Sequence, residues 1–290
     1  MKFSESELKK FLAEQYEPRT IEYYSQIIKQ FISKNGNIDR YNLHQVVEAI
    51  NNEKITCNAS RGVFLGAIKK YYDYLIVKGV RKVHPCRNLF ISYTQQPIQF
   101  QKLFTINELN TLLEIKDVFK KNEERYRAIL SFLVYQALHT AEICNIKIKH
   151  VNFDTKTIYI KGSKTRESRV LDLNDNQINI LNKYLENDRL HFPADGNCFF
   201  FVCTKNKQLT KSNISVALNN YKMMYPDRTL NAITIRQSII SYLLAIEKNS
   251  LESVQLFAGH RWPSSTKKYD NPNKEDKIVA INNYFPNDLY

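Results

Sequence analysis

The sequence lacks the features that mark membrane and secreted proteins. No stretch of about 18 consecutive apolar residues occurs, which excludes a helix long enough to span a bilayer. The first residues, Met1-Lys2-Phe3-Ser4-Glu5, contain no apolar centre of a secretory signal. Internal repeats and low-complexity tracts are missing as well. We therefore expect a globular protein of the cytoplasm that has no membrane partner.

Metal and disulfide patterns are also missing. No CxxC pair occurs, and the six histidines show no metal-ligand spacing near the cysteines. The cysteines are odd in number and widely spaced, at positions Cys57, Cys86, Cys144, Cys198 and Cys203. This usage is typical of reduced structural thiols. We expect neither a disulfide framework nor a metal site.

Acidic residues are too few to balance the basic ones. The chain has 42 Lys and Arg against 29 Asp and Glu, a net charge of +13, and its pI is near 9.3. Such an excess suits a polyanionic partner, because each neutralised phosphate releases counterions. Charge alone does not separate a nucleic-acid-binding protein from a soluble protein that is merely basic.

Length and apolar content indicate two packed domains. The 290 residues exceed the usual length of one domain, and 43% of them are hydrophobic. In residues 1–95, apolar side chains recur three and four positions apart in four successive helical segments. The clearest of these opens at Pro18 and closes at Asn35-Gly36. Nothing in this domain looks catalytic, and its aromatic stripe is better explained as core than as a base-stacking platform.

A linker and a second domain follow. Residues 96–102 belong to a stretch without periodicity, which we interpret as the linker. Thr105-Ile-Asn-Glu108 is a capping box and starts a helix in the second domain, 103–290. Two β segments, Thr157–Ile160 and Arg169–Leu173, flank a turn, and Phe199–Val202 is a candidate short strand. The rest is mainly helical, with a short tail helix over 274–285. The predicted fold class is mainly α with a small β-sheet.

Four motifs follow one another in the second domain. They are Gln136-Ala-Leu-His-Thr-Ala-Glu-Ile-Cys-Asn-Ile, then Ile160-Lys-Gly-Ser-Lys-Thr with Arg169-Val-Leu-Asp-Leu, then Ile233-Thr-Ile-Arg-Gln, and finally Leu256-Phe-Ala-Gly-His-Arg with Tyr269 nine residues after His260. In this order they resemble the boxes of the tyrosine recombinase (phage integrase) family, over about residues 103–285.

The resemblance implies both a fold and an activity. A helical core-binding (SAM-like) domain and a recombinase catalytic domain would form a C-shaped clamp on double-stranded DNA. The activity would be that of a site-specific recombinase or integrase of a mobile genetic element. It would break and rejoin strands through a 3′-phosphotyrosyl intermediate, with type IB topoisomerase-like chemistry and without ATP, metal or cofactor. A tail helix at 274–285 would dock on a neighbouring subunit in a tetramer, unless it packs on its own domain. The early start of the helical domain leads us to expect no arm-site-binding domain before it.

The chemistry explains the residues that the family uses. A phosphodiester repels nucleophiles and has a poor leaving alkoxide, so cationic donors must meet the charge that builds on its oxygens. A tyrosine can attack phosphorus and store the bond energy as an ester. By resemblance, Tyr269 is the nucleophile, and Arg236 grips the scissile phosphate in bidentate fashion. His260 would hydrogen-bond this phosphate, and Lys164 would be the general acid for the departing 5′ oxygen.

Each of these residues has an ordinary alternative when taken singly. Tyr269 is one of 18 tyrosines, Arg236 could join a surface ion pair, and His260 could simply end a helix. Lys164 could belong to a solvated turn. Glu142 matches an acidic position of the first box, where support is a better role than proton transfer. The residues expected to bind DNA are Lys161, Arg166, Arg169 and Arg261.

Two positions depart from the family pattern. His139 replaces the first-box arginine, and Ile233 replaces the second-box histidine. A histidine has an ordinary pKa of about 6.5 and lacks the guanidinium fork, although phosphate and Glu142 would raise its pKa. Ile233 can neither accept nor donate a proton, so His260 or water would have to assist the tyrosine.

Three hypotheses follow. The chain is an active but divergent recombinase, in which His139 or another cation (Arg125, Arg127 or Arg166) fills the gap. Alternatively, it binds DNA and has lost cleavage. A helical transcription regulator would also explain the charge and the helices, but it has no use for the spacing of Gly259-His260 and Tyr269.

Overall fold

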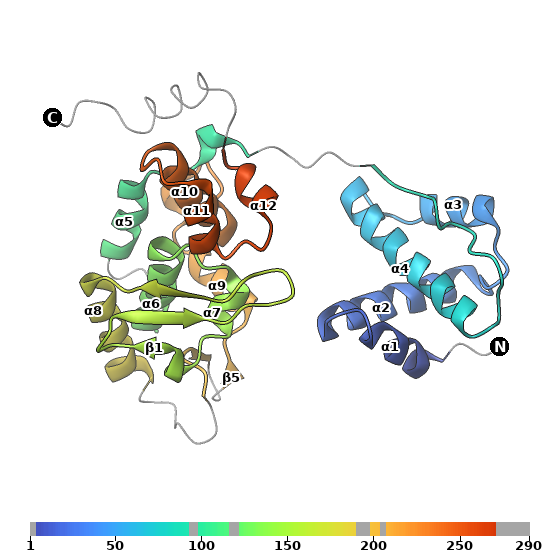
Figure 1. The fold of residues 1–290 in the computed structure, drawn as a ribbon, viewed down its shortest axis with the longest axis horizontal. Coiled ribbons are helices and arrows are strands. Elements are labelled where there is room, and N and C mark those ends of the chain that lie inside the picture. Colours follow the sequence, from blue (N-terminus) through green and yellow to red (C-terminus); the bar gives the residue numbers. More distant parts are fainter. Residues whose placement is uncertain (1–3, 93–97, 116–121, 190–197, 204–206, 271–290) are drawn as a thin grey trace. The chain divides into compact units, whose positions relative to one another are not determined.

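The chain divides into two compact units. The computed structural model describes residues 4–92, 98–115, 122–189, 198–203 and 207–270. The units are Met1–Gln96 and Pro97–Tyr290 (Figure 1). Within the linker predicted at 96–102, Phe100–Lys102 forms the 3-10 helix η1, and Ile98 packs against the core of the second unit. The tail helix expected at 274–285 lies outside the described residues.

Residues 4–92 of the first unit confirm the four predicted helices. Pro18 stands in the first turn of its helix, and Gly36 ends that helix at a φ of 72°. The aromatic stripe is core, as expected: Tyr72 is fully buried and donates its hydroxyl to the Ile38 carbonyl at 3.0 Å. The helices are α1 (Glu5–Ala13), α2 (Pro18–Asn35), α3 (Leu43–Asn51) and α4 (Asn58–Val77).

The second unit is mainly helical around one apolar core. Its first helix begins at the predicted capping box, in which the Thr105 hydroxyl and the Glu108 carboxylate accept each other's backbone N–H. The α-helices are α5 (Ile106–Glu114), α6 (Glu123–Tyr135), α7 (Thr140–Cys144), α8 (Asp175–Lys183), α9 (Lys211–Asn219), α10 (Ala232–Ala245), α11 (Leu251–Ala258) and α12 (Pro263–Lys267). The other helices are the 3-10 helices η2 (Ile148–His150) and η6 (Lys222–Met224) and the π-helix η3 (Tyr184–Asp188).

Two small antiparallel sheets complete this unit. The first has the order β1 (Val151–Asn152), β2 (Thr157–Ile160) and β3 (Arg169–Asp172), as the two predicted β segments require. The second pairs β4 (Val202–Cys203) with β5 (Lys207–Gln208). The strand predicted at Phe199–Val202 is therefore wrong over most of its length. The mainly α fold with a small sheet is confirmed.

None of the helices in the described part of the chain has the length and apolar character that crossing a membrane requires.

Candidate active site

A pocket in the second unit brings most of the predicted site residues together. It has a volume of about 580 Å³ and is lined by Tyr269, Arg236, His260, His139 and Ile233. The remaining lining residues are Thr140, Thr165, Arg166, Lys211, Ser215, Asn231, Ala232, Ser265 and Lys268. Lys164 is not part of the lining, although the β2–β3 hairpin that carries it contributes its two following residues.

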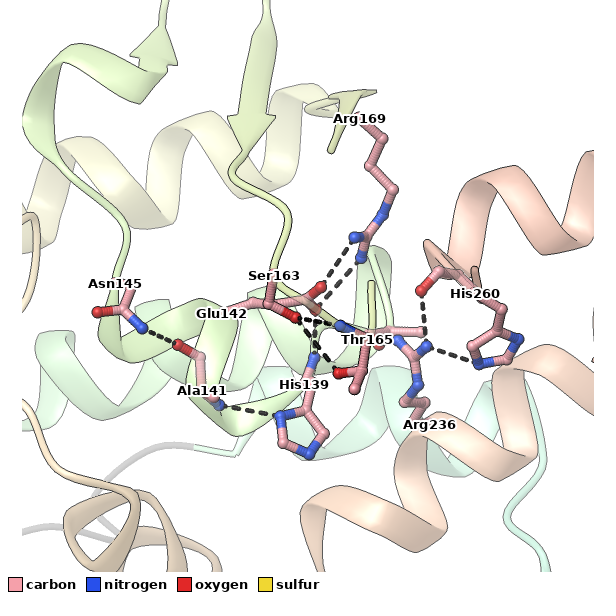
Figure 2. A network of polar contacts seen from close by, with 11 residues as sticks. His139, Ala141, Glu142, Asn145, Ser163, Thr165, Arg169, Arg236 and His260 are labelled. Carbon is pink, nitrogen blue, oxygen red and sulfur yellow. Dashed lines mark hydrogen bonds and ion pairs between the residues drawn. The ribbon is translucent and has the colours of Figure 1, made fainter. Parts of the chain in front are cut away.

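Arg236 ties three segments of the unit together. It sits in the second turn of α10, which begins where the Asn231 side chain accepts two backbone N–H groups. Its Nη1 donates to the Ala137 carbonyl at 2.5 Å, and its Nη2 donates to the Ala258 carbonyl at 2.6 Å and to His260 Nε2 at 2.9 Å (Figure 2). Burial lowers the pKa of Arg236 to about 10, so the guanidinium stays charged at neutral pH.

These contacts limit what Arg236 can offer a phosphate. A guanidinium has five N–H donors, two of them on each terminal nitrogen. Both Nη2 hydrogens are taken by protein acceptors, and one Nη1 hydrogen is taken as well. One Nη1 hydrogen and the Nε hydrogen remain, and they do not lie on one edge of the plane. The predicted bidentate grip is therefore not available in this geometry.

The backbone at Ala137 is adapted to this contact. Ala137 has a φ of 50°, in the left-handed region that a residue with a Cβ adopts at a cost of about 1–2 kcal/mol. The conformation follows the end of α6 at Tyr135 and turns the Ala137 carbonyl toward Arg236. The turn between α6 and α7 is thus stabilised by a charge-assisted hydrogen bond from Arg236.

His260 is neutral, and both of its ring nitrogens are engaged. Because a guanidinium only donates, Nε2 must accept from Arg236, which places the ring proton on Nδ1. From Nδ1 it is donated to Thr266 Oγ1 at 2.9 Å. Burial and the neighbouring Arg236 lower the pKa of His260 to about 3. The expected direct bond to phosphate and the assisting-base role do not fit this arrangement; His260 instead orients Arg236.

Tyr269 lies just after α12 with its ring against His260. The two ring centroids are 6.1 Å apart and the planes differ by 9°, a stacked pair. Tyr269 is 6% exposed and packs with Ile240 and Val254. Burial raises the pKa of its phenol, while Arg236 lowers it. The phenol is therefore protonated at neutral pH and must lose its proton in order to attack.

His139 caps α7 and is neutral. Its ring Nδ1 accepts the Ala141 backbone N–H at 3.1 Å, while the His139 backbone N–H donates to Glu142 Oε2 at 2.8 Å (Figure 2). Since Nδ1 accepts, the ring proton is on Nε2. Burial and the charge of Arg166 lower the pKa of His139 to about 4. Glu142 raises this pKa, as expected, but desolvation and nearby cations lower it by more than the carboxylate raises it.

Glu142 and Arg169 form a buried ion pair outside the lining of the pocket. The Nη1–Oε1 and Nη2–Oε2 distances are 2.8 and 3.3 Å, and the side chains are 5% and 6% exposed. A Cβ on Gly259, which has a φ of 65°, would collide with the Arg169 guanidinium. Arg169, predicted to contact DNA, is instead buried as the partner of Glu142.

The loop between β2 and β3 is held against the segment after α11. The Arg261 guanidinium donates to the Lys164 carbonyl at 2.6 Å and to Glu167 Oε1 at 2.9 Å. The Glu167 N–H donates to the Gly259 carbonyl at 3.1 Å. Lys164 and Lys161 are exposed on this hairpin. Arg261 thus fastens the hairpin, and its expected contact with DNA stays a prediction.

The pocket is strongly cationic. Among the described residues its lining includes Arg166, Lys211, Arg236 and Lys268 and no carboxylate. Sequence reasoning missed both lysines. Lys268 directly precedes Tyr269, which could have indicated it, and its ammonium lies 5.1 Å from the Tyr269 ring centroid. Lys211 is separated from every motif, so only the packing of α9 against α7 places it here.

Two of the three cations expected to replace the missing arginine lie elsewhere. Arg125 is buried and donates to the Val202 carbonyl at 3.0 Å. Arg127 donates to the Leu113 carbonyl at 3.0 Å. Neither is among the pocket residues, whereas Arg166 is.

Known proteins share both the sequence pattern and the fold. The profile of the phage integrase family matches residues 102–276. A tyrosine recombinase of Thermosipho africanus is 24% identical over 90% of this chain and 92% of its own length. The XerC recombinase of Salmonella typhi is 25% identical over 73% of this chain and 68% of its own length.

Solved structures agree with this fold. The XerH recombinase bound to its difH substrate aligns with a TM-score of 0.71 at 19% identity, over 97% of this chain and 85% of that one. A lambda integrase dimer bound to a core site aligns with a TM-score of 0.66 at 13% identity, over 92% and 76%. With the family profile covering more than half of the sequence, this chain belongs to the phage integrase family, that of the tyrosine recombinases, which act in site-specific DNA recombination.

Proposed function

We propose that this protein cleaves and rejoins DNA at a specific site with Tyr269 as its nucleophile. The Tyr269 oxygen attacks the scissile phosphorus, a new O–P bond forms, and the bond to the 5′ oxygen breaks. This leaves a 3′-phosphotyrosyl ester and a free 5′ hydroxyl. A second 5′ hydroxyl then attacks the ester and releases the phenol, so neither ATP nor a metal is consumed. The observation that best supports this reaction is that Tyr269 and Arg236 line one pocket together with three further cationic side chains.

The proton transfers follow from the contacts of the site. His260 has no free nitrogen, and Ile233, 64% exposed at the pocket, cannot accept a proton. The phenol proton therefore goes to water in the pocket. Lys164, on the hairpin that Arg261 fastens beside the pocket, donates a proton to the departing 5′ oxygen.

Adduct formation tests the proposal. The Tyr269→Phe variant of the full chain selects its preferred duplex from a random pool, because binding does not need the hydroxyl. The same duplex, nicked so that cleavage cannot be reversed, is then incubated with each protein. We expect a covalent adduct with the wild type and none with Tyr269→Phe. Tyr159→Phe, a control at an exposed tyrosine of β2, retains the adduct.

A protein that binds DNA without cutting it is the second candidate. Two observations favour it. His139 is neutral, and protein acceptors occupy both Nη2 hydrogens of Arg236, so that no edge of its guanidinium has two free N–H donors. A wild type that binds its selected duplex tightly but forms no adduct establishes this candidate instead. The transcription-regulator hypothesis does not account for the family membership of the chain.

We also propose that four copies of the chain assemble on DNA through residues 274–285. Mass measurement of the protein alone and with a duplex bearing two sites tests this. A chain truncated after 273 is expected to bind one site but not to form the larger complex. A truncated chain that assembles like the full one would remove the tail from the proposal.

A further inference from the structure

Neither position at which the family motifs predict a phosphate-binding arginine gives the pocket a guanidinium with two free N–H donors on one edge. Arg236 is left with one hydrogen on Nη1 and one on Nε, which face different edges of its plane. His139 is held neutral as the cap of α7. The negative charge on a pentacoordinate phosphorus would therefore meet only part of the compensation that phosphoryl transfer requires.

Arg166 has its charge available at this place. It is half-buried, lines the pocket, and its side chain has no hydrogen bond or ion pair with any of the described residues. Arg169, on the same hairpin, differs because its guanidinium is paired with the Glu142 carboxylate. A partly buried guanidinium without an acidic partner is costly unless an anion joins it.

The backbone fixes where Arg166 stands. Its carbonyl accepts the Ser163 N–H at 2.8 Å, which closes the hairpin turn. An isolated β-bridge pairs Arg166 with His260. The same charge lowers the pKa of His139, His260 and Arg236, which places the guanidinium near all three.

The two pocket lysines are less suited to this role. Lys268 lies over the ring of Tyr269, and each lysine presents a point charge. A guanidinium instead presents a planar fork that matches two oxygens of one phosphate. We propose that Arg166 contacts the scissile phosphate through such a fork and takes the place of the arginine for which His139 stands in the first box. The assignment rests on the proposed function of the pocket.

A binding experiment that needs no cleavage tests the contact. Tyr269→Phe protein and the double variant with Arg166→Gln are titrated against the selected duplex, with one phosphate at a time replaced by a neutral methylphosphonate. At one position, neutralisation is expected to weaken binding of the Arg166 protein about tenfold and to leave the Gln protein unchanged. Lys183→Gln, which removes an exposed charge on α8 outside the pocket, keeps the full sensitivity there. If no position couples to Arg166, the assignment is overturned.

Cleavage gives a second and independent measurement. We expect Arg166→Gln to slow adduct formation about a hundredfold. Adding His139→Arg to this variant restores the rate at least about tenfold, because the two guanidinium groups serve one phosphate. A misfolded variant is not rescued in this way. An Arg166→Gln rate within about threefold of the wild type, or a loss that His139→Arg leaves unchanged, overturns the assignment. If one phosphate position couples to Arg166 in the binding experiment but the wild type forms no adduct, the contact of Arg166 with phosphate stands and the proposed cleavage is refuted.

Discussion

The Glu142–Arg169 pair gives a sharp test of what stabilises the site. Glu142→Gln keeps the shape of the side chain and removes its charge. The amide can still accept one hydrogen bond, but Arg169, whose side chain is 6% exposed, loses its counterion. The Glu142 carboxylate also accepts the His139 N–H at 2.8 Å, so the cap of α7 weakens as well. We expect the second unit to be destabilised and the pocket to loosen.

The magnitude follows from the burial of both partners. Removing one member of a buried ion pair leaves the other charged in a poorly solvated place, which typically costs about 3–5 kcal/mol. The pKa of Glu142 is lowered by Arg169 against the effect of burial. A carboxyl with a depressed pKa contributes stability above its unfolded value of about 4.3 and loses it as the pH falls through its folded value. The difference between wild type and variant is therefore full at neutral pH and shrinks in acid.

Urea unfolding of the full chain measures this difference. Circular dichroism follows the helices, and Trp262, the only tryptophan, reports on the second unit. Glu167→Gln is the matched control, because its ion pair with Arg261 is 53% and 44% exposed. Such a pair contributes at most about 1 kcal/mol. If Glu142→Gln costs no more than this control at neutral pH, the buried pair does not have the role we assign to it.

Three further predictions concern the same unit. Ala137→Gly is expected to raise the free energy of unfolding by about 0.5 kcal/mol, because glycine relieves the positive φ but makes the unfolded chain more flexible; a lower thermal midpoint would contradict this. Gly259→Ala is expected to lower the free energy of unfolding by at least about 2 kcal/mol, since its Cβ displaces Arg169, and an unchanged urea midpoint would refute the collision. His260, with a pKa of about 3, should show no imidazole titration by NMR at mildly acidic pH. Because the unfolded chain takes up this proton first, the free energy of unfolding should fall as the pH drops below about 6.5. An imidazole titration midpoint near pH 6.5 in the folded protein would contradict the neutral tautomer.

Local sequence was enough to predict much of this protein. The capping box at Thr105 and the proline and glycine that bound α2 arise from interactions within a few residues, and the strand Thr157–Ile160 pairs with the other arm of one hairpin. Periodicity therefore indicated the helices and the two-domain division. The order of the four boxes predicted a common site for Tyr269, Arg236 and His260, and the pocket contains all three.

Only the tertiary structure decided how those residues are used. Arg166 and Arg169 are three positions apart on one hairpin, yet one lines the pocket and the other is buried against Glu142. Arg236 binds a carbonyl 99 residues away, and this contact occupies part of the fork that its motif predicts for phosphate. A sequence pattern records which donors are present, because residue types and spacings are local. Which donors stay free for DNA depends on the acceptors that packing brings to them, and these come from distant parts of the chain.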